Sequence, residues 1–444
     1  MKIQQFEDKG LGHYSYAVLS ECEKQLIIID PARNPQPYYD YAKVEGAKIV
    51  GIIETHPHAD FVSGHLEIHR STGATIYASK LLAGDYPHQP FDEGAILPLG
   101  KIKLKALNTP GHSPDSISIV LEHEGKDKAV FTGDTLFIGD VGRPDLRENV
   151  GNLKAKRAEL AAQLYDSTHN KLMQLADDVT VYPTHGAGSL CGKALSNVPK
   201  STIGVEKRSN YALQAMDKEA FVQLITEGQP FIPKYFGYDV DLNKRGAEDY
   251  ALSVKAVKIL KNADSLEKEV LLIDARPQAA FKSGHFKGAI NLQNGGKFET
   301  WLGSIVEPQE EFYLLASSEG ELYELIGKAA KIGYESKIKA AIYSKGGGES
   351  TPQVDLAHFK AHKEAYTIVD IRNASELKQE RIFDDALHIP LPELRERANE
   401  IPANKPIIVH CAGGYRSAAG SSILQGLLEH VTVYDLGDRV QEFK

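Results

Sequence analysis

The sequence predicts a multidomain protein of the α/β and α+β classes, and three observations lead to this prediction. The chain has 444 residues, which corresponds to about three domains of roughly 150 residues each. In its first half, apolar runs end in loops that carry histidine or aspartate, and in its second half a pattern of short strands and helices occurs twice. Because strands alternate with helices there, each copy is expected to form a small parallel α/β domain.

The first of these loops holds three side chains that can bind a metal ion. It follows the apolar run at residues 49–53 and contains His56, His58 and Asp60. Side chains at positions i, i+2 and i+4 cannot all converge from a regular strand or helix, so a loop at a strand end must turn them toward one ion. The sequence therefore predicts a metal site at this strand end.

Further candidate ligands end apolar runs downstream. They are His112 after residues 102–107, Asp134 after 129–131, and His185 after 179–181. The alternative is a set of unrelated loop residues, but an ordered series at strand ends favours one shared metal centre.

Composition restricts the function class. A formal charge of −9 and a pI near 6.0 argue against nucleic acid or an anionic membrane as a partner. The N-terminal residues lack the pattern of a signal peptide, and no apolar run is long enough to span a bilayer, so a cytoplasmic location is expected. The three cysteines, Cys22, Cys191 and Cys411, are too few and too far apart for a disulfide framework. Cys22 is expected to be structural.

An internal repeat organises the second half of the chain. Residues 270–276 are echoed by 366–372, and residues 311–315 by 406–410. Helical patterns occur in this half at residues 321–332 and 417–428, and before it at 217–227.

The second copy contains a loop suited to sulfur chemistry. Cys411 links a strand to a helix, and Gly413 and Gly414 allow successive backbone N–H groups to turn toward its sulfur, with Tyr415 and Arg416 closing the loop. Such a nest at a helix N-terminus stabilises a thiolate and can hold the outer sulfur of a persulfide. The alternative is an inert buried cysteine, which the two glycines and the arginine make less attractive.

The first copy lacks these groups. Ala316 stands at the cysteine position and Glu321 at the arginine position. A carboxylate where an anion would bind opposes it by like-charge repulsion. This copy is expected to be catalytically inactive and to act as a spacer or docking module.

The ligand series in the first half resembles the metallo-β-lactamase superfamily. The resemblance implies an αββα sandwich with the metal at one edge between two sheets. In dinuclear members it implies one ion on His56, His58 and His112, a second on Asp60, the next residue and His185, and Asp134 bridging them. The residue after Asp60 is Phe61 in place of histidine, which favours a single metal ion.

With one ion, two imidazoles and one carboxylate form the facial triad that suits iron(II) and oxygen chemistry. The persulfide dioxygenases of this superfamily are built in this way, and their triad corresponds to His56, His112 and Asp134. One Fe(II) per chain is therefore expected as the cofactor. The residues expected to orient these ligands are His58, Asp60 and His185.

Two further residues are candidates near this centre. Arg143, in a segment that resembles the family's GD…GR-x-D run, is expected to clamp an anionic substrate group; the alternative is an arginine that ties down its loop through Asp140 or Asp145. Cys191 follows His185 by six residues. It is expected either to carry a persulfide near the metal or to cap a buried turn.

Both copies in the second half resemble the rhodanese fold, and the whole order resembles the CstB type of persulfide dioxygenase–sulfurtransferase fusion in bacterial sulfide detoxification. The resemblance implies oxidation of low-molecular-weight thiol persulfides by O2 to sulfite, and sulfur transfer through Cys411 to give thiosulfate. The expected domains are 1–250, 254–345 and 350–444.

Two other function classes stay open. A zinc thioester hydrolase of the glyoxalase II type would use a metal-bound hydroxide, and a thiol-based redox sensor would use Cys411 as a switch. The identity of the thiol carrier and the oligomeric state, a homo-oligomer included, stay open as well.

Overall fold

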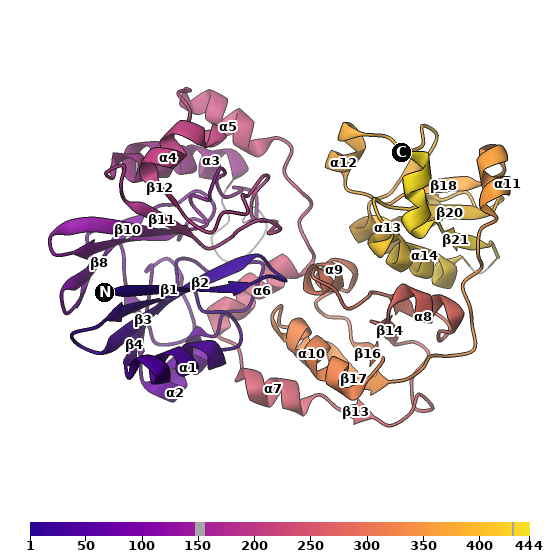
Figure 1. Ribbon diagram of the computed structural model, residues 1–444, viewed down its shortest axis with the longest axis horizontal. Helices are drawn as coiled ribbons and strands as arrows, with labels where there is room; N and C mark the ends of the chain where they lie inside the picture. Colours follow the sequence, from indigo (N-terminus) through magenta and orange to yellow (C-terminus); the bar gives the residue numbers. More distant parts are fainter. Residues whose placement is uncertain (147–155, 429) are drawn as a thin grey trace. The chain divides into compact units, whose positions relative to one another are not determined.

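The computed structural model describes residues 1–146, 156–428 and 430–444. Contacts divide the chain into two compact units (Figure 1). The first unit comprises Met1–Leu252 with Lys331–Gly333, and the second comprises Ser253–Ala330 with Tyr334–Lys444.

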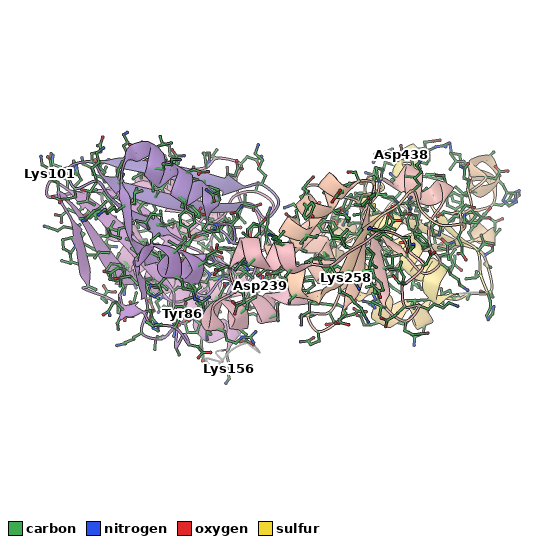
Figure 2. All side chains as sticks on the ribbon, turned by 90° about the horizontal axis from the view of Figure 1, so that it is seen from below. Tyr86, Lys101, Lys156, Asp239, Lys258 and Asp438 are labelled. Atoms are coloured by element: carbon green, nitrogen blue, oxygen red, sulfur yellow. The ribbon has the colours of Figure 1, made fainter. Side chains whose placement is uncertain are left out.

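The first unit contains two six-stranded sheets. The first sheet has the strand order β1 (Lys2–Asp8), β2 (His13–Ser20), β3 (Gln25–Ile29), β4 (Lys48–Ile53), β5 (Thr75–Ala78) and β6 (Gln89–Pro90). The second has the order β12 (Ser201–Thr202), β11 (Thr180–Pro183), β10 (Lys126–Gly133), β9 (Ile117–His123), β8 (Ile102–Asn108) and β7 (Ile96–Leu99). Lys101, labelled in Figure 2, lies in the exposed turn between β7 and β8.

Apolar side chains from both sheets form the central core of this unit. Tyr16 and Ile29 of the first sheet pack in one buried cluster with Leu104 and Phe131 of the second. Side chains alternate between the two faces of a strand, so the opposite face of each sheet needs its own cover. The helices supply it.

Helices α1 to α5 cover the outer faces of the two sheets (Figure 1). Tyr38 of α1 and Ile68 of α2 pack on the first sheet, and Leu164 of α3, Ile203 of α4 and Phe221 of α5 pack on the second. The αββα sandwich is thereby confirmed. The helix bounds are α1 (Gln36–Glu45), α2 (His65–Thr72), α3 (Arg157–Tyr165), α4 (Ile203–Ser209), α5 (Lys218–Thr226), α6 (Tyr235–Arg245) and α7 (Tyr250–Ala256).

The second unit contains two smaller sheets, and every strand pair in them is parallel. The third sheet has the order β13 (Ile259–Leu260), β17 (Ile338–Tyr343), β16 (Phe312–Ala316), β14 (Leu271–Asp274) and β15 (Ile290–Asn291). The fourth has the order β19 (Leu387–His388), β18 (Thr367–Asp370), β20 (Ile407–His410) and β21 (Val433–Asp435).

Helices connect these parallel strands, as the two predicted small α/β folds require. They are α8 (Gln278–Ser283), α9 (Phe298–Ile305) and α10 (Glu319–Ala330) in the first copy, and α11 (Leu356–Ala361), α12 (Ala374–Gln379), α13 (Leu394–Arg397) and α14 (Tyr415–Leu427) in the second. The predicted fold class is confirmed, while the domain limits 1–250, 254–345 and 350–444 stay predictions.

Candidate functional site

The candidate metal centre lies where strands of both sheets end. The loop after β4 carries His56, His58 and Asp60, and all of residues 51–66 are buried. From the second sheet, Asp134 directly follows β10 and His185 lies two residues beyond β11. His112 lies on the loop that joins β8 to β9. Strand ends from two sheets thus converge on one buried place.

His56, His112 and Asp134 form one cluster, in which one ligand atom from each lies within 4.8 Å of the others. Nε2 of His112 is 3.4 Å from an Asp134 oxygen and Nε2 of His56 is 3.8 Å from the same oxygen. These are two imidazoles and one carboxylate, each at most 3% exposed.

His58, Asp60 and His185 form a second cluster of the same size. Nε2 of His185 lies 3.3 Å from Asp60 and 3.5 Å from Asp134, so Asp134 is shared between the two clusters. Burial alone would lower the pKa of His185, but the Asp134 and Asp60 carboxylates raise it to about 9. The structure therefore brings all six predicted residues together.

Several buried atoms of this centre lack a well-aligned hydrogen-bond partner among the described residues. They are both carboxylate oxygens of Asp134, Oδ1 of Asp60 and Nε2 of His185. Buried polar atoms without partners carry a high free-energy cost, and a cation bound between them would remove it. Imidazole nitrogens with carboxylate oxygens are a donor set that fits a divalent transition metal.

Asp30, which sequence reasoning missed, organises three of the histidines. Its carboxylate accepts hydrogen bonds from Thr55 Oγ1 at 2.9 Å and Thr184 Oγ1 at 3.1 Å, and lies 3.1 Å from His58 Nε2. Burial alone would raise the pKa of Asp30, but the neighbouring His58 holds it below its usual value.

The two threonines connect Asp30 to His56 and His185. Thr55 Oγ1 lies 3.1 Å from Nδ1 of His56, and Thr184 immediately precedes His185. On the far side, Nδ1 of His185 lies 3.2 Å from the carbonyl of Gly12. Contacts of this kind orient metal-binding imidazoles and fix their tautomers. The one available signal in the sequence was an aspartate directly after the apolar run Ile27–Ile29.

Phe61 fills the place at which dinuclear sites were expected to carry a histidine. Its side chain is 1% exposed and stacks on His58, with ring centroids 4.3 Å apart, and packs 3.8 Å from the ring of His13. An apolar ring thus lies against the second cluster.

Arg143 is committed to internal contacts. Its guanidinium donates two hydrogen bonds to Asp145, at 2.7 and 2.8 Å, and further ones to the carbonyls of Leu190, Phe231 and Pro230. Together these contacts engage all five N–H groups of the guanidinium. The geometry fits the alternative of a loop-tying arginine.

Cys191 lies beside the metal centre. Its sulfur belongs to a third buried group with Asp134 and His185, within 4.8 Å of one another. Burial raises the pKa of the Cys191 thiol well above its usual value, and the Asp60 and Asp134 carboxylates raise it further. Its proximity to the metal residues keeps it a candidate for sulfur handling.

The candidate sulfur site is the loop between β20 and α14. Cys411 is 1% exposed, and the N–H of Gly414 donates a hydrogen bond to its sulfur at 3.1 Å. Gly414 has a φ of +101°, which L-residues rarely adopt. One N–H of the predicted backbone nest thus contacts the sulfur, at the N-terminus of α14.

The equivalent loop of the first copy is occupied by its own side chain. Ala316 ends β16, and the carboxylate of Glu321 accepts a hydrogen bond from the N–H of Ser317 at 2.9 Å. A carboxylate in this place leaves the copy with neither a thiol nor an anion-binding cation, which agrees with the expected inactivity.

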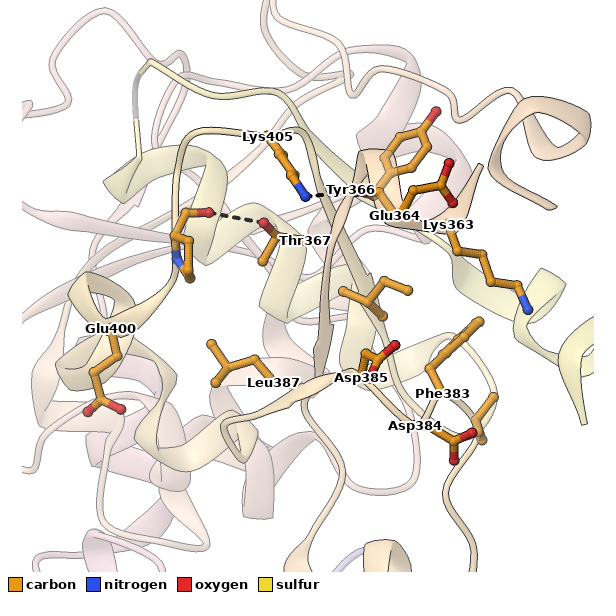
Figure 3. Close-up of a pocket in the computed structure, with 13 residues that line it drawn as sticks. Lys363, Glu364, Tyr366, Thr367, Phe383, Asp384, Asp385, Leu387, Glu400 and Lys405 are labelled. Atoms are coloured by element: carbon orange, nitrogen blue, oxygen red, sulfur yellow. Dashed lines mark hydrogen bonds between the residues drawn. The ribbon is translucent and has the colours of Figure 1, made fainter. Parts of the chain in front are cut away.

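The second copy also contains a cavity of about 670 Å³, whose lining residues are drawn in Figure 3. Thr367 and Lys405 line it, and Thr367 pairs with Ile407 at the amino ends of β18 and β20. Cys411 follows the carboxyl end of β20. The cavity is thus at the opposite end of the sheet from the cysteine.

Comparison with known proteins agrees with this geometry. The sequence profile of the Metallo-beta-lactamase superfamily matches residues 9–185, and that of the rhodanese-like domain matches residues 257–349 and 354–439. The chain is 25% identical to "Persulfide dioxygenase ETHE1, mitochondrial" of Bos taurus over 243 residues, 54% of this chain and 87% of that protein.

Two further similarities bear on the family. A hydroxyacylglutathione hydrolase of Francisella philomiragia subsp. philomiragia is 30% identical over 228 residues, 50% of this chain and 83% of that protein. The crystal structure of a metallo-beta-lactamase from Staphylococcus aureus subsp. aureus COL is 30% identical, with a TM-score of 0.69, and covers 77% of this chain and 98% of that one.

Within the part of the chain that the structure describes, none of the helices combines the length and apolar character that crossing a bilayer requires. The candidate metal-ligand residues lie within the matched lactamase segment, and Cys411 lies within the second rhodanese match. The chain therefore belongs to the metallo-beta-lactamase superfamily and carries two rhodanese-like domains after its lactamase domain.

Proposed function

We propose that this protein oxidises low-molecular-weight thiol persulfides with O2 at one iron(II) ion and passes sulfane sulfur through Cys411 to sulfite, forming thiosulfate. The observation that carries the proposal is the buried cluster of His56, His112 and Asp134 in the same chain as the Cys411 loop. A relative named as a persulfide dioxygenase supports it.

In the oxidation, persulfide, O2 and water give thiol and sulfite. His56, His112 and Asp134 would hold the iron, which supplies the redox step between persulfide and O2. Asp30 keeps His56 oriented through Thr55, and the burial of residues 51–66 limits the access of bulk water.

In the transfer, the thiolate of Cys411 attacks the outer sulfur of a second thiol persulfide, releases the thiol, and carries that sulfur as a persulfide. The sulfur of sulfite attacks that outer sulfur, the S–S bond to Cys411 breaks, and the bonding electron pair returns to Cys411 Sγ. The N–H of Gly414 stabilises the negative charge on this sulfur.

A second candidate is a zinc thioester hydrolase. The cluster of His58, Asp60 and His185 beside Asp134 could hold another ion, and a relative named as a hydroxyacylglutathione hydrolase supports this alternative. Phe61, packed on His58, counts against it.

The deciding experiment measures metal content of anaerobically purified full-length protein and O2 uptake on adding glutathione persulfide. We expect one iron per chain and persulfide-dependent O2 uptake. Asp134→Ala should lose both and keep sulfur transfer from thiosulfate, since the two sites use separate residues. Two zinc ions with thioester hydrolysis and no O2 uptake would replace the proposal by the hydrolase.

The coupling of the two reactions has its own test. Wild type should form mainly thiosulfate, whereas Cys411→Ser should release sulfite with little change in O2 uptake. A mixture of Asp134→Ala and Cys411→Ser proteins at low concentration should form thiosulfate more slowly than wild type, because tethering raises the effective concentration of sulfite. Equal rates would show that tethering contributes nothing.

A further inference from the structure

The internal repeat separates contacts that serve the fold from contacts that serve the sulfur site. Arg372 binds Asp370 at 2.6 Å in the copy with the cysteine, and Arg276 binds Asp274 at 2.6 Å in the copy without it. Both pairs are buried at the end of the corresponding strands, β18 and β14. A pair that both copies keep is explained by the fold alone.

Among the described residues, a second ion pair of the cysteine copy has no counterpart at the corresponding positions of the other copy. Arg416, the last residue of the Cys411 loop, donates to both oxygens of Glu376, at 2.6 and 2.7 Å. The repeat places Ala280 and Glu321 at the corresponding positions of the other copy. Both partners are thus missing in the copy that lacks the cysteine.

The inactive copy also contacts this loop. The guanidinium carbon of Arg416 lies 5.8 Å from the ring centroid of Trp301, which belongs to α9 of the inactive copy. Tyr415 donates a hydrogen bond from its hydroxyl to the carbonyl of Gln293, also of the inactive copy, at 2.8 Å. The two residues that close the Cys411 loop are thus held from across the repeat.

We propose that the sulfur site is shared between the two copies: Glu376 and Trp301 are positioning residues that hold Arg416 near Cys411, where Arg416 binds the oxyanion of the sulfur acceptor. This rests on the proposed role of Cys411 as the sulfur carrier. It gives the inactive copy, expected to be a spacer or docking module, a part in the sulfur site.

Arg416 has N–H groups left with which to bind an oxyanion. Among the described residues, its hydrogen-bond partner is Glu376, which accepts one hydrogen bond from each terminal nitrogen. Nε–H and the second N–H of each terminal nitrogen stay available for an oxyanion. A planar guanidinium held between a carboxylate and an aromatic face keeps one orientation, which a lysine in its place would not.

A comparison of two sulfur acceptors distinguishes lost positioning of Arg416 from a general loosening of the fold. Sulfite and cyanide can both attack the outer sulfur of the Cys411 persulfide and release Cys411 as thiolate. In one case an S–S bond of thiosulfate forms, and in the other the C–S bond of thiocyanate forms. Sulfite presents three oxygens to Arg416 and cyanide presents none, so loss of Arg416 positioning should weaken sulfite selectively.

The test uses full-length protein whose Cys411 is loaded anaerobically with glutathione persulfide and then desalted. Single-turnover formation of thiosulfate is measured against sulfite concentration, and thiocyanate formation against cyanide concentration. Trp301→Ala and Glu376→Ala should each raise the half-saturating sulfite concentration about tenfold and change the cyanide reaction less than about twofold. Trp301→Phe, which keeps an aromatic ring, should recover most of the loss, and Arg416→Lys should not.

Arg395→Ala is the matched control. Arg395 makes a bidentate ion pair with Glu310 of the inactive copy, at 2.7 and 2.8 Å, and also donates to the Ile305 carbonyl. Its loss loosens contact between the copies without touching Arg416, so its sulfite dependence should match wild type. The proposal is overturned if Arg395→Ala and Trp301→Ala have equal effects, or if sulfite and cyanide are affected equally.

Two more results keep this inference separate from the proposed function. If Cys411→Ser still transfers sulfur, the proposed carrier is wrong.

Trp301 is the only tryptophan in the chain, so its fluorescence can be followed without interference. Sulfite binding to unloaded protein should change its emission in wild type and not in Arg416→Ala; an unchanged wild-type emission would count against a shared site.

Discussion

Nε2 of His58 lies 3.1 Å from a carboxylate oxygen of Asp30, a residue 28 positions earlier in the chain at the end of a neighbouring strand. A carboxylate that holds one ring nitrogen determines which nitrogen is left for a metal ion. The same carboxylate reaches His56 through Thr55. One side chain of the first sheet therefore sets the orientation of two candidate ligands.

Replacing Asp30 should weaken metal binding without removing a ligand. In Asp30→Asn, the amide cannot accept all the hydrogen bonds that the carboxylate accepts from Thr55 and Thr184, so the histidines lose their fixed tautomers. We expect metal affinity to fall about 10- to 100-fold, measured by competition with a chelator. Glu206→Gln is the control, because Glu206 is equally buried and accepts hydrogen bonds from Gly139 and Asn210. Equal losses in both variants would argue against the orienting role.

The fold was largely predictable because its signals are local. The alternating burial of β8 follows directly from its apolar and polar side chains, and α5, at Lys218–Thr226, lies within the predicted 217–227. The helices predicted at 321–332 and 417–428 each begin two residues earlier in the structure, at Glu319 and Tyr415. Their first turns are polar or glycine-flanked, so hydrophobic periodicity carries little information there.

The site was predictable only where a motif marks it. The loop ligands and Cys411 lie in recognisable runs, whereas Asp30 is a single aspartate after a strand. Glu376 and Trp301 lie 40 and 115 residues before Arg416, and only the folded chain brings them to it. From the sequence, Arg143 could bind the substrate or hold its own loop in place. Its hydrogen bonds to carbonyls 47 to 88 positions away favour the second role.

Phe61 should control the number of bound metal ions. Phe61→His places a nitrogen ligand beside His58 and Asp60 and removes the apolar ring that packs on His58. We expect metal content to rise from about one to about two ions per chain, measured by elemental analysis after dialysis against metal-buffered solution. Phe61→Leu should stay at one. Two ions in the wild type would contradict the single-metal proposal.

Gly414 should be more important to sulfur transfer than its neighbour Gly413. A Cβ at Gly414 would lie 3.1 Å from the backbone of Asp438 and Gly437, at a φ of +101°, whereas a Cβ at Gly413 would meet no atom within 4 Å. Such strain is worth about 1–3 kcal/mol and would displace the N–H that binds Cys411. Gly414→Ala should lose at least about tenfold in single-turnover thiosulfate formation, and Gly413→Ala clearly less. Equal effects would show that sulfur transfer requires flexibility of the loop rather than the position of the Gly414 N–H.

His410 should make the second copy sensitive to acid. The side chain is fully buried at the end of β20, and burial lowers its pKa from 6.5 to about 4. Above pH 6.5 both folded and unfolded chains hold a neutral imidazole, and stability is complete. Between pH 6.5 and 4 the unfolded chain binds a proton that the folded chain does not, so the free energy of unfolding falls as the pH falls, by about 3 kcal/mol in all.

The inactive copy suggests the variant that tests this. Leu315 stands there at the position of His410, so His410→Leu introduces a side chain that the fold already accommodates. Amide hydrogen exchange in β20, compared between variant and wild type at each pH, should show that the variant loses less protection than wild type from pH 6.5 to 4. His362→Leu changes an exposed histidine of the same copy and should keep the wild-type pH dependence. If His410→Leu keeps it too, the acid sensitivity of this copy originates in another group, with the buried Asp370–Arg372 pair as the next one to test.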